Sequence, residues 1–196
     1  MRAASYRLTF FSILMLVSST FVLAQAAGEA GDEVTPPIDA CALLQSTEIA
    51  AAIARAVEPA ERGDSGYVTG GAFSSTCVWK VLEPGLRVPA PDAPMGGRHF
   101  VILNAFRWPA GKGLAKKFLE SFYEAAKRGD IPHTPEPRKL GDDALWWGDG
   151  MAVRQGDVSF GVSVFVAGVS PQQAEKIEHD LAVRILKRLP RSAGQF

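Results

Sequence analysis

The sequence predicts an α+β domain, with a mainly antiparallel sheet of about five strands and amphipathic helices packed on one face of it. Short segments that alternate apolar and polar residues predict the strands, and Gly-rich turns separate them. Two longer segments with apolar residues at helical spacing follow groups of strands, so the two halves of the chain have a similar outline. Strands are expected at residues 72–82, 99–108, 144–147, 151–155 and 158–166, and long helices at 113–128 and 170–189.

Two short helices are expected before the first strand. Asp39 is placed to cap a turn that carries Cys41, and Ser46 is placed to cap a helix whose apolar residues recur at helical spacing. A loop rich in glycine and charge follows at residues 58–71. Residues 83–97 hold four prolines and therefore predict a long loop that cannot pair regularly.

The stretch KLGDDALWWGDG, at residues 139–150, combines two turns with a short strand. Asp142 and Asp143 fit a turn because their side chains can accept hydrogen bonds from nearby backbone N–H groups. Side chains alternate along a strand, so Trp146 and Trp147 must point to opposite faces of the sheet. One of them is then expected in the core, and the other is free to meet a ligand.

The last predicted strand, residues 158–166, carries valine and phenylalanine on one side and serine and glycine on the other. The valine-rich side is expected to take the helices. The side of Ser159 and Ser163 is expected to meet solvent or to form the floor of a shallow groove. The final helix begins with a capping box at Ser170 and ends before Pro190.

The first 26 residues have the three parts of a secretory signal peptide. Arg2 and Arg7 precede an apolar run of about 16 residues, followed by the small residues that a signal peptidase accepts. That run is shorter than the roughly 20 residues of a membrane-spanning helix, although an uncleaved anchor is the alternative. We expect a periplasmic or secreted protein without a membrane span after cleavage. The expected parts are a signal peptide at 1–26, a flexible leader at 27–37, a single domain at 38–190 and a tail at 191–196.

The charge balance argues against nucleic acid as a partner. The chain has 21 basic and 21 acidic residues, and the loss of Arg2 and Arg7 with the signal leaves 19 basic residues, a net charge of −2. A phosphate-binding surface needs clustered lysine and arginine, whereas the basic runs here lie beside acidic residues on predicted helices.

Cys41 and Cys77 are the only cysteines, and an isolated pair in an exported chain usually forms a disulfide. Closing a loop of about 37 residues should stabilise the fold by roughly 3–4 kcal/mol. A catalytic thiol or a metal site is the alternative. Either would need histidines close by, and His99, His133 and His179 are scattered along the chain.

Few motifs point to catalysis. Gly63-Asp64-Ser65-Gly66 matches the tetrapeptide around the nucleophile of trypsin-like proteases, but no histidine precedes it, as that family's order requires, so a loop is expected. No phosphate-binding, dinucleotide-binding or zinc-protease motif occurs, so neither a cofactor nor a metal is expected. Asp142, Asp143, Asp149 and Asp157 lack the spacing of a calcium loop and fit turns instead.

Six residues are the candidates for a ligand-binding surface. His99 begins a strand directly after the proline-rich loop, although a histidine at a strand end need have no special role. Tryptophans in a sheet usually belong to the core, and the alternative is that one or two of them form the wall of a groove. The candidates are Trp79, His99, Trp108, Trp147, Ser159 and Ser163.

Three short motifs are Asp39-Ala40-Cys41-Ala42-Leu43-Leu44 with Glu48, Cys77-Val78-Trp79, and Leu140-Gly141-Asp142-Asp143-Ala144-Leu145-Trp146. Together they resemble a group of small exported bacterial domains of unknown function, of the type common in actinobacterial lipoproteins. The resemblance covers about residues 38–189 and implies paired cysteines, an exported domain and a closing helix. It implies no catalytic residues. The chain departs from the lipoproteins because no cysteine for lipid attachment lies near the predicted cleavage site.

The first functional hypothesis is a non-catalytic exported domain that binds a small molecule or a partner protein of the cell envelope. A periplasmic hydrolase-like enzyme that uses His99 is the second, and it requires a carboxylate within hydrogen-bond reach of the imidazole in a cleft. The third is a purely structural accessory protein of the envelope. The oligomeric state leaves no signal in the sequence.

Overall fold

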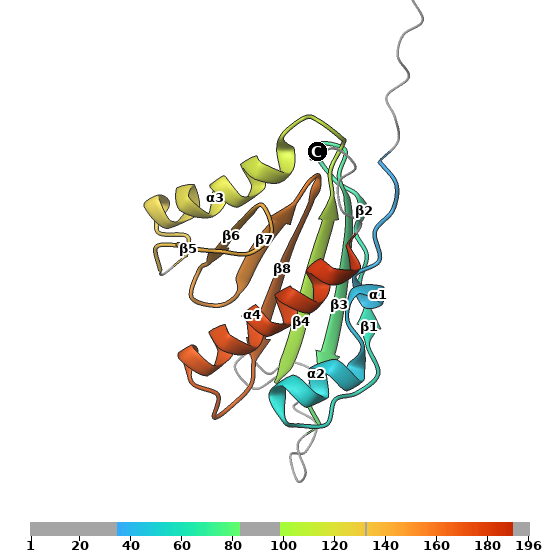
Figure 1. Cartoon of the computed structure of the whole chain (residues 1–196), viewed down its shortest axis with the longest axis vertical. Helices are drawn as coiled ribbons and strands as arrows, with labels where there is room; N and C mark the ends of the chain where they lie inside the picture. Colours follow the sequence, from blue (N-terminus) through green and yellow to red (C-terminus); the bar gives the residue numbers. More distant parts are fainter. Residues whose placement is uncertain (1–34, 83–98, 132, 190–196) are drawn as a thin grey trace, which may run out of the picture. The chain divides into compact units, whose positions relative to one another are not determined.

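A computed structural model describes residues 35–82, 99–131 and 133–189 (Figure 1). Within these ranges the chain forms an antiparallel sheet of eight strands, in the order β1-β3-β4-β8-β7-β6-β5, with β2 also paired to β3. The α+β class is confirmed, and the expected number of five strands is too small. The strands are β1 (Glu61–Arg62), β2 (Gly66–Tyr67), β3 (Phe73–Lys80), β4 (Phe100–Arg107), β5 (Glu136–Arg138), β6 (Asp143–Trp146), β7 (Met151–Gln155) and β8 (Val158–Phe165).

The three strands that the sequence did not predict are β1, β2 and β5. β1 and β2 lie in the predicted loop at 58–71. Each of the three strands has only two or three residues, and such a short segment carries too little alternation to indicate a strand. β1 and β5 lie at the two ends of the strand order. Very short edge strands offer little unpaired backbone to other chains.

The register of the central strands defines two faces of the sheet. Cys77 of β3 lies opposite Leu103 of β4, and Leu103 lies opposite Val162 of β8. Directly paired residues point to the same side, so these side chains share one face, named here the core face. β4 lies between β3 and β8.

Three helices pack on the core face: α1 (Ala40–Leu43), α2 (Ser46–Ile53) and α4 (Pro171–Arg188). Their apolar side chains meet the valine-rich side of β8, as predicted. Figure 1 shows α4, in red, lying across the strands. The buried side chains of this core include Leu43, Leu44, Ile49, Trp79, Leu103, Met151, Phe160, Val162, Leu181 and Ile185.

The fourth helix, α3 (Leu114–Arg128), packs on the opposite side of the sheet, named here the second face. Its Leu119 forms a small buried cluster with Leu145 and Ala152, which alternate with the core-face residues of β6 and β7. The expectation that all helices pack on one face is therefore wrong. A helical stripe predicts that a helix is buried on one side, but it does not say which face of a sheet it covers. The two halves of the chain share an order of elements and place their long helices on opposite faces.

The helix ends follow the expected capping chemistry with one exception. Asp39 Oδ1 accepts hydrogen bonds from the backbone N–H groups of Cys41 and Ala42, as predicted. The second helix is capped at Gln45, not at the predicted Ser46, because Glu48 Oε2 accepts a bond of 2.9 Å from the Gln45 N–H.

Glu48 also ties α2 to α4. The Arg188 guanidinium bonds to both oxygens of Glu48, at 2.7 and 2.9 Å, and these bonds hold the pKa of Glu48 down at about 2. In α4 itself Ser170 Oγ accepts from the Gln173 N–H, which confirms the predicted capping box.

Several predicted parts lie outside the described residues: the signal peptide at 1–26, the proline-rich loop at 83–97, the tail at 191–196 and most of the leader. Thr35, in the predicted leader, is buried, and its carbonyl accepts a hydrogen bond of 2.9 Å from the Tyr67 hydroxyl. Among the described residues, no helix has the length and apolar composition that a membrane crossing requires.

Candidate functional site

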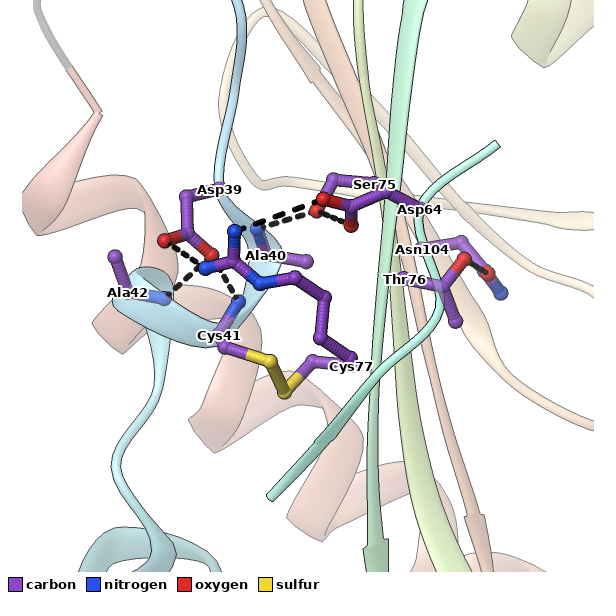
Figure 2. Close-up of a disulfide and its surroundings, with 10 residues drawn as sticks. Asp39, Ala40, Cys41, Ala42, Asp64, Ser75, Thr76, Cys77 and Asn104 are labelled. Atoms are coloured by element: carbon purple, nitrogen blue, oxygen red, sulfur yellow. Dashed lines mark hydrogen bonds and ion pairs between the residues drawn. A yellow bond between two sulfur atoms is a disulfide. The ribbon is translucent and has the colours of Figure 1, made fainter. Parts of the chain in front are cut away.

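Cys41 and Cys77 form a disulfide that joins α1 to β3, which confirms the predicted pair (Figure 2). The two Cα atoms are 5.1 Å apart, and 36 positions separate the residues in the chain. The thiols therefore take no part in the candidate site.

The polar residues that surround the disulfide form hydrogen bonds and an ion pair with one another (Figure 2). Ser75 Oγ donates to Asp64 Oδ1 at 2.6 Å and accepts from the Ala40 N–H at 3.0 Å, and Arg62 pairs with Asp39. Asp64 belongs to the protease-like tetrapeptide, which connects β1 to β2. Its carboxylate thus holds a buried serine of β3 and has a structural role.

The aspartates of the KLGDDALWWGDG stretch also have structural partners. Asp142 Oδ2 accepts a bond of 2.7 Å from the Gly156 N–H, and Asp143 Oδ2 accepts a bond of 2.7 Å from Arg154 Nε. Asp142 thus bonds the turn between β7 and β8, and Asp143, the first residue of β6, bonds a side chain of β7, whereas the prediction was bonds to nearby backbone N–H groups. Within the described ranges, no group of three or more His, Cys, Asp or Glu side chains could hold a metal ion.

The six candidate binding residues do not form one site. Trp79 is fully buried on the core face, and its Nε1 has no hydrogen-bond partner among the described residues. His99 lies just before β4, is half-buried, and accepts a backbone bond of 2.8 Å from the Val81 N–H. The other four candidates, Trp108, Trp147, Ser159 and Ser163, lie on or beside the second face.

Those four residues form two pairs beside α3. Trp108 Nε1 donates a hydrogen bond of 2.8 Å to Ser159 Oγ, and Ser159 is fully buried. Trp147 and Ser163 both lie against Gly150, because a Cβ at that position would come closer than 3.0 Å to each of them. Both serines are buried, whereas the sequence led us to expect them at solvent or on a groove floor.

A row of aromatic rings joins the two tryptophans beneath α3. Trp108 contacts Phe118 at 5.8 Å between ring centroids, Phe118 contacts Phe122 at 5.5 Å, and Phe122 contacts Trp147 at 4.9 Å. Phe106 of β4 lies 5.1 Å from Phe118 and completes the row. These rings are half-buried and attach α3 to the sheet.

Beyond α3, four apolar side chains of the part of the chain that the structure describes lie on the second face and belong to neither buried cluster, as members or as packed neighbours. Val78, Phe100 and Ile102 are half-buried, and Phe165 is 40% exposed. The sheet register makes Val78 and Ile102 direct partners across β3 and β4, and Phe100 and Phe165 direct partners across β4 and β8. We name these four side chains the apolar strip.

Polar residues border the apolar strip. Lys80, the partner of Phe100 on β3, makes an ion pair of 2.5 Å with Glu61 of β1. On the next row, Thr76 Oγ1 donates a bond of 2.8 Å to Asn104 Oδ1. No residue of the strip was among the sequence candidates. Alternation along the strands would have placed Val78 on the side opposite Cys77, and Phe165 on the side of Ser163, so the signal was present in the pattern.

Comparison of the chain with protein-family models, with curated proteins and with solved structures gave no match. The resemblance to small exported actinobacterial domains therefore stays a prediction.

Proposed function

We propose that this protein is an exported, non-catalytic binding domain that holds a partner protein of the cell envelope against the apolar strip. The observation that carries the proposal is the position of Val78, Phe100, Ile102 and Phe165 on the second face, outside both buried clusters. No described helix covers these side chains.

The four side chains are contiguous, which separates them from ordinary exposed apolar residues. Single exposed apolar residues are normal on a protein surface, whereas contiguous patches mark interaction sites. Here two direct cross-strand pairs stand on three neighbouring strands, and the rings of Phe100 and Phe165 are 5.0 Å apart. A partner that covers this area would remove all four side chains from water together.

The surroundings of the strip favour a partner protein over a small molecule. Protein interfaces combine an apolar centre with a polar rim, and here the Lys80–Glu61 ion pair provides a charged rim. Small-molecule sites are concave and enclose most of the ligand. On the next row of the sheet, the polar side chains of Thr76 and Asn104 bond to each other.

The disulfide supports the proposed location in the periplasm or outside the cell. Disulfides persist in oxidising environments such as the periplasm and the extracellular space, and Cys41 and Cys77 are paired. An exported chain meets its partners there, so the partner is expected among envelope or secreted proteins.

Site-specific photocrosslinking in producing cells tests the proposal. A benzophenone amino acid replaces Phe165 in the strip or, as a control, Lys176 on the solvent side of α4, whose side chain is 79% exposed. We expect one discrete protein adduct from position 165, no such adduct from position 176, and loss of the adduct when Val78→Ser and Ile102→Ser are added.

Two outcomes would overturn the proposal: the same adducts from both positions, or no adduct from position 165. If instead native mass spectrometry of the purified protein shows a bound small molecule that Phe165→Ser removes, the strip takes a small apolar ligand and the partner-protein form is wrong.

A further inference from the structure

Glu178 is a carboxyl group buried between α4 and the sheet, with only 1% of its surface exposed. Its Oε1 accepts a hydrogen bond of 3.0 Å from the Val164 N–H of β8, and its Oε2 accepts one of 3.2 Å from Trp146 Nε1 of β6. One side chain therefore connects α4 to two strands of the core face.

The hydrogen bond to Val164 replaces a strand-to-strand bond that β7 does not provide at this point of the sheet. β7 pairs with β8 only as far as Val162, which lies opposite Met151. Val164 lies two residues beyond the end of that pairing, so Glu178 takes the place of the missing strand as the acceptor for its N–H. A buried N–H without an acceptor is costly, so this bond fixes the end of β8 as well as the helix.

The charged groups around Glu178 do not neutralise it. Glu175 of α4 and Asp149 of the turn after β6 both disfavour a negative charge at this position. Arg138 of β5 has its guanidinium 5.9 Å from the centre of the Trp146 ring, and it is engaged by Glu136 at 2.9 Å and by Glu175 at 2.5 Å. Glu178 thus has two neutral N–H donors and no cation of its own among the groups that face it.

We propose that Glu178 holds α4 on the sheet in a pH-dependent way. The contact is stable when the carboxyl is protonated and is weakened when the carboxyl ionises. Burial without a counter-ion favours the neutral carboxyl, whereas the two N–H donors favour the ionised one, and burial is the larger effect. An ionised one is penalised by the loss of water and by Glu175 and Asp149.

The pH range follows from the surroundings. Burial, opposed in part by the bonds from Val164 and Trp146, raises the pKa of Glu178 from 4.5 to about 7. The closed state binds a proton that the opened state releases between these two values, so opening becomes easier as the pH rises. The contact between α4 and the sheet would then weaken when a mildly acidic medium becomes neutral or alkaline.

Hydrogen exchange of the Val164 amide, resolved by NMR, tests the proposal on the full chain with its disulfide intact. After correction for intrinsic exchange, the opening constant of this amide should rise about tenfold from pH 6 to pH 8. Amides of the β1–β3 pairing at the edge of the sheet should change much less, because they open locally without exposing Glu178. In Glu178→Gln, whose side chain stays neutral at every pH, the rise should disappear.

A Val164 opening constant that stays the same from pH 6 to pH 8 in the wild-type chain would overturn the proposal, and this result needs no variant. An equal rise in Glu178→Gln would also overturn it, because another group would then be responsible. If the Gln variant does not fold, the wild-type profile and the pH titration of the Trp146 indole N–H signal decide. That signal should shift with a midpoint near the pKa of Glu178, about 7, and a flat indole signal contradicts the proposal.

Discussion

Trp146 and Trp147 are consecutive in the chain, and their side chains anchor helices on opposite faces of the sheet. Trp146 donates a hydrogen bond to Glu178 of α4 on the core face, whereas the Trp147 ring lies 4.9 Å from Phe122 of α3 on the second face. The last residue of β6 and the residue that follows it therefore contact the helices of the two faces.

Gly150→Ala should destabilise the fold. A Cβ at this position would come closer than 3.0 Å to Ser163 Oγ and to the Trp147 ring, and neither can move freely because the serine is buried and the ring packs on Phe122. We expect the free energy of unfolding in urea to fall by about 1–3 kcal/mol, as for other overpacked sites. Gly63→Ala is the matched control, because a Cβ there meets nothing within 4 Å, and equal stability of the two variants would contradict the packing around Trp147.

The Trp108–Ser159 hydrogen bond should show a coupling energy in a double-mutant cycle. Trp108→Phe leaves the fully buried Ser159 hydroxyl without its indole donor, and Ser159→Ala removes the acceptor of the indole N–H. We expect the summed stability losses of the two single variants to exceed the loss of the double variant. The difference, which is the coupling energy, should be about 1 kcal/mol. Urea unfolding of the four proteins measures it. Additive losses would show that the bond does not contribute.

Most of the regular structure followed from local patterns in the sequence. The alternation of β3 and β8 and the helical stripe of α4 predicted these elements and their buried sides, because burial of one face imposes a period on the residues. The face that α3 covers was not predictable. It depends on which strands lie beneath the helix, and the pairing of β4 with β8, more than 50 positions apart in the chain, decides that.

The candidate site was predicted only in part. Trp147, Ser159 and Ser163 lie on the second face, but they pack beside α3. The apolar strip next to them was not predicted. Glu178 was missed although it lies on the buried stripe of α4, four residues after Ala174 and three before Leu181. A charged residue on such a stripe is a signal for a buried carboxyl. Its partners, Val164 and Trp146, come from other strands and could not be read from the helix.

Loss of the disulfide should lower stability without changing the fold. Cys41→Ala with Cys77→Ala removes the link between α1 and β3, and 36 positions separate the two residues. We expect the free energy of unfolding to fall by about 3–4 kcal/mol, because the unfolded chain gains the freedom that the closed loop had removed. Urea unfolding with and without reductant measures the loss. Reductant should destabilise the wild type and leave the double variant unchanged.

Glu178 should make the global stability fall as the pH rises. Its pKa is about 7 in the folded chain and 4.5 as its ordinary value, so the folded state binds more protons than the unfolded state between these limits. The stabilising effect of the proton is fully present below about pH 4.5 and is lost as the pH rises through about 7. Over that range the contribution to the free energy of unfolding should decrease by about 3 kcal/mol.

Urea unfolding at pH 5 and at pH 8 measures this contribution as the difference between wild type and Glu178→Gln. The variant should gain stability relative to wild type on going from pH 5 to pH 8, because its side chain cannot ionise in the buried site. Glu120→Gln on the exposed side of α3 is the control for the loss of one carboxylate, and its difference from wild type should stay nearly constant. If the Glu178→Gln difference is also constant, Glu178 is ionised in the folded protein at both pH values, and a water or cation must accompany it.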